Sequence, residues 1–522
     1  MNTSQLRALL EKKGADAELT FQLLNQVNRG DIQNTLLVPD SFPAPDGQDI
    51  LDMQSAPPGL PEESVRQAFH LYFSDLCPED YGKFTLGFFY STPEQLMELG
   101  LRLLGKTAYG VLNGGSATSY GDEKKNRSYG DKLFEIYQKP LNQQAQDYEG
   151  KPKGITPAFI HPDGTPGPSF MEIKIRAIGI QALYHFWLTG KVATPEFFQM
   201  TSRGTHDSLL KSLEEYKKSP LLEPLIQAAG WENINFKTEI QGLIGTFTPL
   251  DSLGKREIFT FATDQGLDVF PLPGGHGQNF RVLEPLYRSM NAQGYEFAYI
   301  GNVDNLGYLP DPLSLALLAL KGSSGGFDFS FKTPVDVKGG VLYKSQEGRL
   351  NCGDIGVALS KETVEKAGNS GKTTLLFNCA TGVFNLTYLI DNLDNIIKNL
   401  PLRLSEQDKD VGKYAQVEQV TWEVLGLMDN PLIFAVEKSK RFLAAKLLIE
   451  SFITSGWKFS DPKFQTPELV ELKKLAQQMN QGLQNLLQGP YGFKLQGERW
   501  VPLSVQELRD RFETRGLKDL RA

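Results

Sequence analysis

Two short segments near the middle of the chain have the residue types that a phosphate or metal site needs. The first is a tight loop, Pro273-Gly274-Gly275-His276-Gly277, whose glycines let backbone N–H groups approach a ligand closely. The second, Asn302-Val303-Asp304-Asn305, follows a short apolar run at 297–300 that predicts a buried strand. Open α/β sheets bind ligands beyond the carboxyl ends of their strands, where Asp304 would lie. The plain alternative is a surface turn and a helix-capping aspartate, but the two segments together favour a site.

A glycine-rich loop follows another expected strand. Residues 108–112 are apolar and continue directly into the small and polar residues of 113–121. A strand followed by a glycine-rich loop opens a nucleotide-binding α/β unit. This loop is not a P-loop, because no Gly-Lys-Ser/Thr follows, and its glycine spacing is not that of the dinucleotide fingerprint. Alone, the pattern is equally typical of a plain turn.

The elements that would position these loops alternate between strand and helix, which predicts βαβ units and a mostly parallel sheet. Expected strands cover 108–112, 196–200, 234–240, 258–262, 297–300, 326–332, 340–343 and 373–378. Expected helices cover 170–185, 205–216, 309–321, 361–367 and 382–399, and Glu347-Gly348 is a candidate hairpin turn. We therefore predict an N-terminal mainly helical region (1–104), a catalytic-type α/β domain (105–400) with a polar surface insertion at 122–150, and a mainly helical C-terminal region (401–522).

Composition restricts the class of protein. A chain of 522 residues is too long for one ordinary domain. A net charge of -8 argues against nonspecific nucleic-acid or anionic-membrane binding. No run approaches the ~20 apolar residues of a membrane span, and the first residues do not resemble a signal peptide. The three cysteines, Cys77, Cys352 and Cys379, have no metal-ligand spacing and give no disulfide framework, so we expect a reducing, cytoplasmic location.

Taken in order, the motifs resemble those of the eukaryotic-type UDP-sugar pyrophosphorylase family, most closely its UTP–glucose-1-phosphate uridylyltransferase branch. Residues 112–121 are L-N-G-G-S-A-T-S-Y-G where the family has L-N-G-G-L-G-T-S-M-G, and 273–277 match its P-P-G-H-G loop. Residues 301–307 match S-N-I-D-N-L-G, 336–342 match D-V-K-G-G-T-L, and 441–446 match R-F-L-P-V-K. The segment 377–386 lies where the family has F-N-T-N-N-L-W-x-N-L, so the resemblance covers residues 100–450.

The resemblance implies a GT-A-like, Rossmann-related domain with flanking helices. It also implies transfer of a uridylyl group from UTP to a sugar 1-phosphate, giving a UDP-sugar and pyrophosphate. Such chemistry depends on in-line positioning and on neutralisation of phosphate charge by Mg²⁺ and lysine. The implied nucleotide-binding residues are Leu112, Asn113, Gly114, Gly115, Thr118, Gln241 and Gly275; the implied sugar-phosphate-binding residues are His276, Asn302, Asp354 and Thr381; the implied catalytic residues are Lys153 and Lys446; and the implied Mg²⁺ ligand is Asp304.

Several of these roles have a chemical reason. A directional amide such as Gln241 could discriminate the uracil edge, and a hard Mg²⁺ ion prefers carboxylate and phosphate oxygens. Lys153 would replace the lysine that ends the family's first motif, displaced here by the insertion at 122–150. Lys446 would neutralise charge between the two phosphates. The residues around Lys446 alone favour a helix-surface lysine that snorkels from an apolar face.

The departures from the family pattern concern the sugar and the first loop. Ala380 and Thr381 lie where the family has two sugar-facing asparagines, and Asp354 is shorter than the family's glutamate. Changed polar partners change sugar choice, so N-acetylhexosamine 1-phosphate or broad specificity is an alternative to glucose 1-phosphate. Because Ser116-Ala117 replaces Leu-Gly, a non-catalytic nucleotide-sugar-binding regulator is another alternative. A glycosyltransferase would need a D-x-D motif, which 302–304 half matches, and the oligomeric state stays open.

Overall fold

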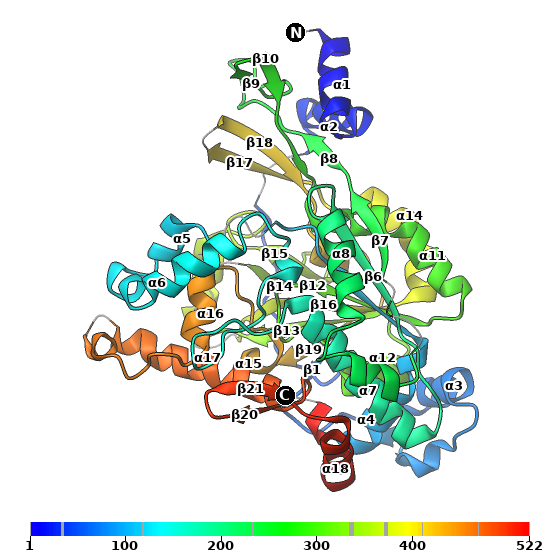
Figure 1. Cartoon of the computed structure of the whole chain (residues 1–522). Coiled ribbons are helices and arrows are strands. Elements are labelled where there is room, and N and C mark those ends of the chain that lie inside the picture. The colour runs from blue at the N-terminus through cyan, green and yellow to red at the C-terminus, as the bar shows by residue number, and fades with distance from the viewer. Residues whose placement is uncertain are drawn as a thin grey trace.

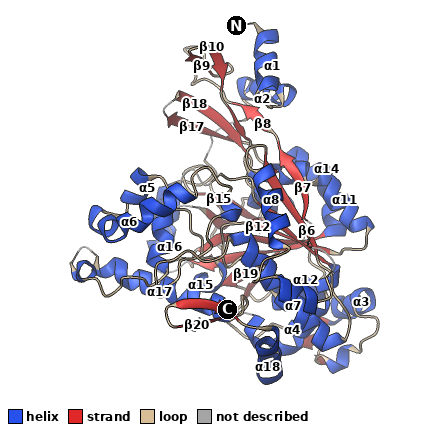
Figure 2. Ribbon diagram, viewed as in Figure 1, coloured by secondary structure: helices blue, strands red, loops and turns tan. Residues whose placement is uncertain are grey.

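A mixed sheet, ten-stranded among the described residues, passes through the middle of the molecule (Figures 1 and 2). The computed structural model describes residues 2–32, 36–116, 120–231, 234, 236–333, 339–369, 374–409, 411–467 and 469–520. In spatial order the main path of the sheet is β1 (Ile50–Asp52), β19 (Leu432–Val436), β13 (Gly325–Phe331), β16 (Leu376–Asn385), β12 (Phe297–Asn302), β5 (Thr107–Leu112), β6 (Glu196–Ser202) and β7 (Phe236–Gln241). The hairpin of β14 (Gly340–Lys344) and β15 (Leu350–Asp354) extends from β16.

The direction of the strands confirms the predicted α/β class with a mostly parallel sheet. Along the main path only β16 is antiparallel to its neighbours, β12 and β13; the other adjacent pairs are parallel. Strands β5 and β12 are buried almost throughout, because helices cover both faces. Parallel strands buried on both faces have continuous apolar sequences, which explains why the two runs were recognisable as strands.

Helices pack on both faces of the sheet, and an apolar core lies between the helices and the sheet on each face. One face is covered by α3 (Glu62–Tyr72), α4 (Pro93–Arg102), α7 (Phe170–Thr189) and α12 (Pro312–Lys321), and the other by α10 (Asn279–Val282), α11 (Glu284–Ala292) and α14 (Leu386–Asn399). The sequence of α7 is apolar on nearly every side, as expected of a helix buried on all sides. A Cβ at Gly100 would lie 1.7 Å from the carbonyl oxygen of Pro312, so glycine is what lets α4 approach α12.

The remaining helices lie around this core. They are α5 (Glu123–Arg127), α6 (Asp131–Asp147), α8 (His206–Tyr216), α9 (Glu223–Ala228), α13 (Lys361–Asn369), α15 (Lys438–Arg441), α16 (Leu448–Thr454), α17 (Val470–Gln488) and α18 (Val505–Arg515). Small sheets are formed by β2 (Leu60–Pro61), β3 (Lys83–Thr85) and β4 (Phe88–Tyr90), and by β20 (Phe493–Gln496) with β21 (Arg499–Pro502).

A second, smaller lobe projects from one end of the sheet (Figure 1). It contains α1 (Thr3–Lys12), α2 (Ala17–Arg29) and three antiparallel strand pairs: β8 (Leu243–Gly245) with β11 (Pro271–Pro273), β9 (Thr260–Thr263) with β10 (Gly266–Val269), and β17 (Arg403–Lys409) with β18 (Gly412–Glu418). Its own apolar core includes Leu10, Leu23, Phe247 and Ala415. Strand β7 leads into β8, and β11 leads into the loop at 273–277. The lobe therefore carries one wall of the candidate site.

The structure differs from the predicted regions in three places. The sheet takes β1 from the region 1–104 and β19 from the region 401–522, so it crosses both predicted boundaries. Residues 401–522 contain β17 to β21 and are therefore less helical than predicted. The segment 122–150 is not merely a charged surface, because α6 buries an apolar face against α16 and the chain near α17.

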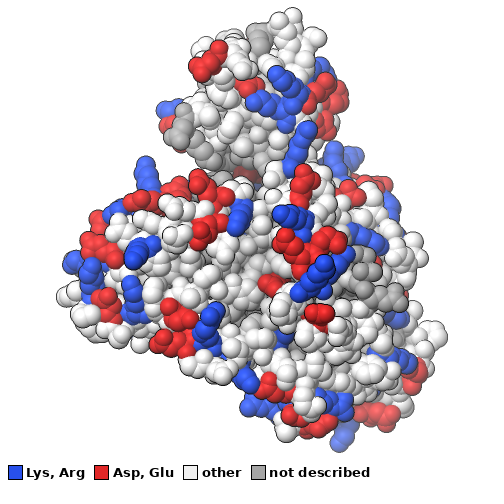
Figure 3. All heavy atoms as spheres, in the orientation of Figure 1, with Lys and Arg blue, Asp and Glu red and all other residues white. Residues whose placement is uncertain are grey.

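The surface on the face drawn in Figure 3 has basic and acidic side chains interspersed. In the part of the chain that the structure describes, no helix is both long enough and apolar enough to cross a membrane.

Candidate functional site

The carboxyl ends of four strands meet at one edge of the sheet and bring several predicted residues together. Asn302 at the end of β12 pairs with Leu112 at the end of β5, and Leu112 pairs with Met200 of β6. Ser202 of β6 pairs with Gln241 at the end of β7. The register therefore places three features along the same edge, as expected for ligand binding by an α/β sheet. They are the loop at 113–116 after β5 (the glycine loop), the turn at 302–305 after β12 (the Asp304 turn) and Gln241.

The glycine loop is held against the segment that carries Lys153. Ser116 forms an isolated β-bridge with Pro152, and the Lys153 N–H donates to the Gly115 carbonyl at 3.0 Å. A Cβ at Gly115 would have nothing within 4 Å, so this glycine borders open space. Thr118 lies outside the described residues. Backbone pairing thus brings residues 115–116 and 152–153 together, although the insertion at 122–150 separates them in the sequence.

The Asp304 turn is held against the segment that carries Lys446 in the same way. Asn305 forms an isolated bridge with Ala444, and the Leu306 N–H donates to the Leu443 carbonyl at 3.0 Å. Lys446 is exposed in the irregular stretch between α15 and α16 and not on a helix, so the picture of a helix-surface lysine does not hold. Its backbone N–H donates to Glu450 Oε2 at 2.6 Å.

Lys153 links the two pairs of segments. Its side chain is only 7% exposed, and Nζ donates to the Ala445 carbonyl at 2.5 Å. Nζ also lies 4.1 Å from the centre of the Tyr120 ring. The glycine loop, the Asp304 turn and both predicted catalytic lysines are therefore connected through one chain of backbone and side-chain contacts.

The charges of these groups act on one another. Burial lowers the pKa of Lys153 to about 8, while the Asp304 and Glu450 carboxylates act to raise it and Lys446 to lower it. Lys174 on α7 is fully buried; burial lowers its pKa to about 7, against the raising effect of Asp304. Its Nζ donates to the carbonyls of Asn305 (2.7 Å) and Tyr308 (3.0 Å), so it also supports the turn after Asp304.

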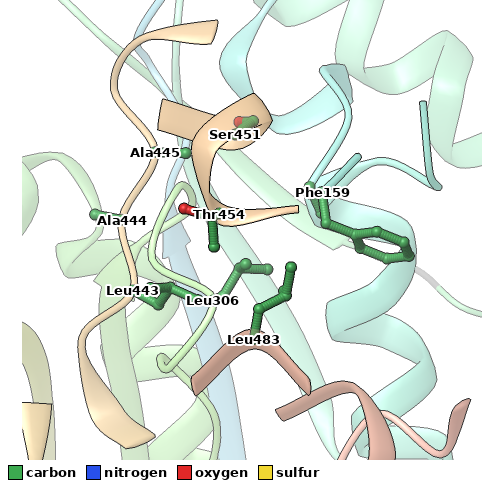
Figure 4. Close-up of a pocket in the computed structure, with 9 residues that line it drawn as sticks. Phe159, Leu306, Leu443, Ala444, Ala445, Ser451, Thr454 and Leu483 are labelled. Carbon is green, nitrogen blue, oxygen red and sulfur yellow. The ribbon is translucent and has the colours of Figure 1, made fainter. Parts of the chain in front are cut away.

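A small cavity is lined in part by the 443–445 segment (Figure 4). Its lining is mainly apolar and consists of Ala158, Phe159, Leu306, Leu443, Ala444, Ala445, Ser451, Thr454 and Leu483. Because charged groups do not line it, we regard it as a packing feature of the 443–445 segment and not as a phosphate site.

Gln241 and the loop at 273–277 form the other wall. The Gln241 amide donates from Nε2 to the Gly275 carbonyl (2.7 Å) and to Gln278 Oε1 (2.9 Å). A Cβ at Gly114 would lie 3.5 Å from Gln241 Oε1, so the acceptor end of this amide lies close to the glycine loop. Gly275 has φ +80°, and a Cβ there would lie 2.4 Å from the Gln419 carbonyl oxygen. Only glycine fits both requirements.

Asn113 and His276 are two polar residues of the candidate site whose side chains are buried or contacted by buried groups. Asn113 is fully buried; Nδ2 donates to Gln199 Oε1 at 3.1 Å, but Oδ1 has no hydrogen-bond partner within the described chain. A buried carbonyl without a partner is costly and is uncommon in folded proteins. His276 is contacted through Nδ1 by Thr421, and burial together with Lys446 lowers its pKa to about 4.

The residues predicted to bind the sugar differ in their surroundings. Asp354 ends β15, and burial raises its pKa although Lys446 and Arg403 act to lower it. Thr381 is buried on β16, where Oγ1 donates to the Cys379 carbonyl at 3.3 Å. The structure thus brings Asp354 into the electrostatic range of Lys446 but does not bring the Thr381 hydroxyl into an open position. Ala380, next to it, has φ +50°, a backbone conformation that favours glycine or asparagine.

Three further residues support the site. Asn305 is fully buried and links three segments: Nδ2 donates to the carbonyls of Cys379 and Arg441, and Oδ1 accepts from the N–H groups of Gly307 and Leu443. The motif at 302–307 could have pointed to Asn305. Lys174 and Thr421 belong to no motif of the resemblance, so nothing in the sequence marked them.

Comparison with solved structures finds proteins of similar fold. Solved structures of similar fold include a UDP-glucose phosphorylase from Trypanosoma brucei (TM-score 0.54, 16% identity, covering 87% of this chain and 78% of that one). Another is a uridine diphosphate N-acetylglucosamine pyrophosphorylase from the same organism (TM-score 0.52, 15% identity, covering 76% of this chain and 80% of that one). At these identities the likeness concerns the fold.

Sequence comparison finds relatives of one kind. Residues 262–461 match the family model described as UTP--glucose-1-phosphate uridylyltransferase. The UTP--glucose-1-phosphate uridylyltransferase of Pyrus pyrifolia is 27% identical over 332 residues, 59% of this chain and 64% of the relative. That of Solanum tuberosum is 28% identical over 271 residues, 48% of this chain and 50% of the relative. The matched part thus spans less than two thirds of either relative. These matches confirm the resemblance to the UDP-sugar pyrophosphorylase family.

Proposed function

We propose that this protein is a Mg²⁺-dependent nucleotidyltransferase that makes a UDP-sugar and pyrophosphate from UTP and a sugar 1-phosphate, with glucose 1-phosphate as the first candidate. The observation that carries the proposal is the connection made by Lys153. The 152–153 segment is paired with the loop at 113–116, and the 443–445 segment is paired with the turn after Asp304. The hydrogen bond from Lys153 Nζ to the Ala445 carbonyl joins these two pairs, and Lys446 follows directly after Ala445. The segments that carry Lys153, Lys446 and Asp304 are thus joined beside a loop whose Gly115 borders open space, and the charges of Asp304 and Lys446 act on Lys153.

The arrangement suits in-line phosphoryl chemistry. An anionic oxygen of the sugar 1-phosphate forms a bond to the α-phosphorus of UTP, while the bond from that phosphorus to its bridging oxygen breaks and pyrophosphate leaves with the electron pair. No general base is required, because the attacking oxygen is already ionised. Lys153 and Lys446 would offset the negative charge that accumulates on the phosphates.

One carboxylate, Asp304, is the proposed magnesium ligand, and the described residues form no cluster of three or more metal-ligating side chains. Mg²⁺ is commonly held by one or two carboxylates together with substrate phosphates and water. Asp304 is partly exposed at the strand edge and acts electrostatically on Lys153, one of the proposed phosphate-binding groups. Asp304 would hold the ion, which supplies neutralisation of phosphate charge when bound.

The wall formed by Gln241 supports a preference for uridine. Its Nε2 is engaged within the protein, which leaves Oε1 as an acceptor near the glycine loop. Uracil presents an N3–H donor on its base-pairing edge, whereas cytosine has an acceptor there. An acceptor fixed in this way would discriminate UTP from CTP, because the wrong base would leave two acceptors facing each other.

The proposal leaves two candidates for the sugar 1-phosphate. Ala380 offers no side-chain hydrogen bond, so another group must contact the sugar hydroxyls. The glucose and N-acetylglucosamine pyrophosphorylases share this fold, so the fold does not separate these substrates. The second candidate is therefore an N-acetylhexosamine or broad-specificity UDP-sugar pyrophosphorylase.

The test is pyrophosphate release from UTP and Mg²⁺ with a panel of sugar 1-phosphates: glucose, galactose, N-acetylglucosamine and a uronic acid. We expect release with at least one sugar, and glucose 1-phosphate as the best. Release with N-acetylglucosamine alone would support the second candidate. Silence across the panel, in a protein that still binds UTP or a UDP-sugar, would contradict the transferase and support a non-catalytic nucleotide-sugar-binding protein.

A further inference from the structure

The ring of His276 is held on one side by a single residue, Thr421, at the start of the 3₁₀ helix η6 (Thr421–Leu427). The Thr421 backbone N–H donates to His276 Nδ1 at 3.1 Å, and Thr421 Oγ1 lies 2.7 Å from the same nitrogen. A backbone N–H can only donate, so Nδ1 must accept. A proton on Nδ1 would point at the Thr421 N–H and lose this bond.

Thr421 is itself fixed by a buried network. Asn279 donates from Nδ2 to Thr421 Oγ1 (3.0 Å) and to the His276 carbonyl (2.9 Å). Tyr287 donates to Asn279 Oδ1 at 3.0 Å. Thr421, Asn279 and Tyr287 are all fully buried, which keeps water away from these bonds. The Thr421 Oγ1 also lies 3.0 Å from the His276 carbonyl oxygen. The hydroxyl proton therefore has two acceptors on His276, this carbonyl oxygen and Nδ1.

The ring carries no charge near neutral pH. Burial lowers the pKa of His276 to about 4, and the positive charge of Lys446 acts in the same direction. A neutral imidazole has one proton, and with Nδ1 used as an acceptor that proton is on Nε2. Within the described part of the chain Nε2 has no hydrogen-bond partner, so its N–H is available to a ligand.

We propose that Thr421 is a positioning residue that fixes His276 as the neutral Nε2–H tautomer, so that the ring presents one hydrogen-bond donor to a phosphate oxygen. The identity of that ligand, the sugar 1-phosphate, rests on the proposed function; the tautomer is a property of the free protein. A neutral donor orients the phosphate without adding positive charge, which leaves charge neutralisation to Lys153, Lys446 and the metal. A sugar-phosphate contact made this way does not depend on histidine protonation at physiological pH.

The direct test is nitrogen NMR of the full chain with ¹⁵N-labelled histidine, in which the His276→Asn variant identifies the His276 signals among the five histidines. We expect Nδ1 to have the shift of an unprotonated, hydrogen-bonded nitrogen and Nε2 that of a protonated one. Both should stay unchanged between about pH 8 and about pH 5.5, a range in which an ordinary histidine becomes charged. A proton on Nδ1, or a ring that titrates within that range, would overturn the proposal.

Two variants test the role of the hydroxyl. Thr421→Val keeps the backbone N–H and the side-chain shape but removes Oγ1, whereas Thr421→Ser restores it. We expect Thr421→Val to broaden or shift the His276 signals and to weaken use of the sugar 1-phosphate by about three- to tenfold, with UTP binding unchanged. Thr421→Ser should retain the wild-type tautomer and lie within about twofold of wild type.

The result separates this inference from the proposed function. The NMR measurement needs no substrate, so a protein that is silent with every sugar 1-phosphate but shows the fixed Nε2–H tautomer would disprove the transferase and keep the role of Thr421 on the ring. An active enzyme in which Thr421→Val leaves both the His276 signals and the sugar kinetics unchanged would overturn the inference and keep the transferase.

Discussion

The two walls of the candidate site are built differently. On the wall that we propose binds the nucleotide, the polar groups are tied by buried hydrogen bonds: Gln241 to Gly275 and Gln278, and Asn113 to Gln199. On the wall that we propose binds the sugar, Ala380 has only a methyl group, and the Thr381 hydroxyl donates to a carbonyl of its own strand. A preorganised wall selects one ligand strongly, because an incorrect ligand leaves fixed polar groups unpaired. We therefore expect this protein to select its nucleotide more strictly than its sugar.

The largest expected effect comes from the groups that both walls share. We predict that Asp304→Asn and Lys446→Ala each lower the rate of pyrophosphate formation by about 10²- to 10³-fold, because each removes a charge that would face the reacting phosphates. The measurement is the initial rate at saturating UTP, with circular dichroism to check the fold. Lys446 is exposed, so Lys446→Ala should change thermal stability little, whereas Asp304→Asn should lower it because the Asp304 carboxylate favours the charged forms of buried Lys153 and Lys174.

Matched surface residues provide the controls. Asp394 on α14 and Lys440 on α15 belong to exposed or partly exposed ion pairs, with Arg288 and Glu437 respectively. Exposed pairs of this kind contribute little to stability. Asp394→Asn and Lys440→Ala should therefore leave the rate near that of wild type. If they lowered it as much as the two site variants do, general charge and not the site would be responsible.

The buried lysine on the nucleotide side gives a pH-dependent prediction. The pKa of Lys153 is lowered by burial to about 8, below the ordinary value of 10.5. Between those values the unfolded chain binds more protons than the folded one, so the free energy of unfolding should rise with pH, and the full cost of the buried charge is present below about pH 8. This cost is roughly 3 kcal/mol.

Lys153→Met should remove that pH dependence and should also weaken UTP binding. In the wild type, UTP affinity should fall as the pH rises above about 8, because the neutral amine no longer attracts phosphate, and Lys153→Met should show weak binding at every pH. Denaturation and calorimetry between about pH 7 and about pH 10 would measure both effects. A wild-type stability curve identical to that of Lys153→Met would show that the buried ammonium does not have this cost.

Breaking the nucleotide wall should have a moderate effect. Gln241→Ala removes the proposed uracil contact and leaves the Gly275 carbonyl and Gln278 without their donor. We predict that the preference for UTP over CTP falls by about tenfold, the size of one hydrogen bond lost from a fixed polar site. Competition of UTP and CTP for pyrophosphate release measures the preference. An unchanged preference would mean that another group identifies the base.

Adding an amide to the sugar wall should have the smallest effect. Ala380 has φ +50°, a conformation that asparagine tolerates better than alanine does, so Ala380→Asn should change the free energy of unfolding by less than about 1 kcal/mol. We expect a few-fold change in the ratio of glucose 1-phosphate to N-acetylglucosamine 1-phosphate use, about the effect of one added sugar contact. A loss of UTP affinity instead would place residue 380 nearer the nucleotide than we propose.

The fold could be predicted from sequence where apolar runs ended in turn residues. The runs of β5 and β12, and the hairpin turn at Glu347-Gly348 between β14 and β15, were recognisable because burial on both faces and turn geometry leave local patterns. The join of β1 with β19 was not predictable, since it depends on pairing between segments almost 400 residues apart, with Ile50 opposite Ile433. Likewise, the charges of 122–150 concealed the apolar face of α6, which is spaced at helical intervals among polar residues.

The site was predictable to the extent that its residues lie in motifs. The motifs contained the loop at 113–116, Asp304 and Lys446, and Gln241 was inferred from its place at a strand end. The contact of Lys153 with Ala445 was not predictable, because neither residue's neighbourhood carries a signal for the other. Thr421 donates its own backbone N–H to the His276 ring, and Lys174 donates to backbone carbonyls of the 305–308 segment; such contacts leave no spacing pattern in the chain. Long-range hydrogen bonds, and not the identity of single residues, assemble the site.

The central claim is that these segments together transfer a uridylyl group, and the reverse reaction tests it most directly. Labelled pyrophosphate would be incubated with Mg²⁺ and UDP-glucose or UDP-N-acetylglucosamine, and the label followed into UTP. We predict that the wild type forms labelled UTP from at least one UDP-sugar, while Asp304→Asn forms about a hundredfold less. Binding of a UDP-sugar by the wild type without any label in UTP would contradict the account.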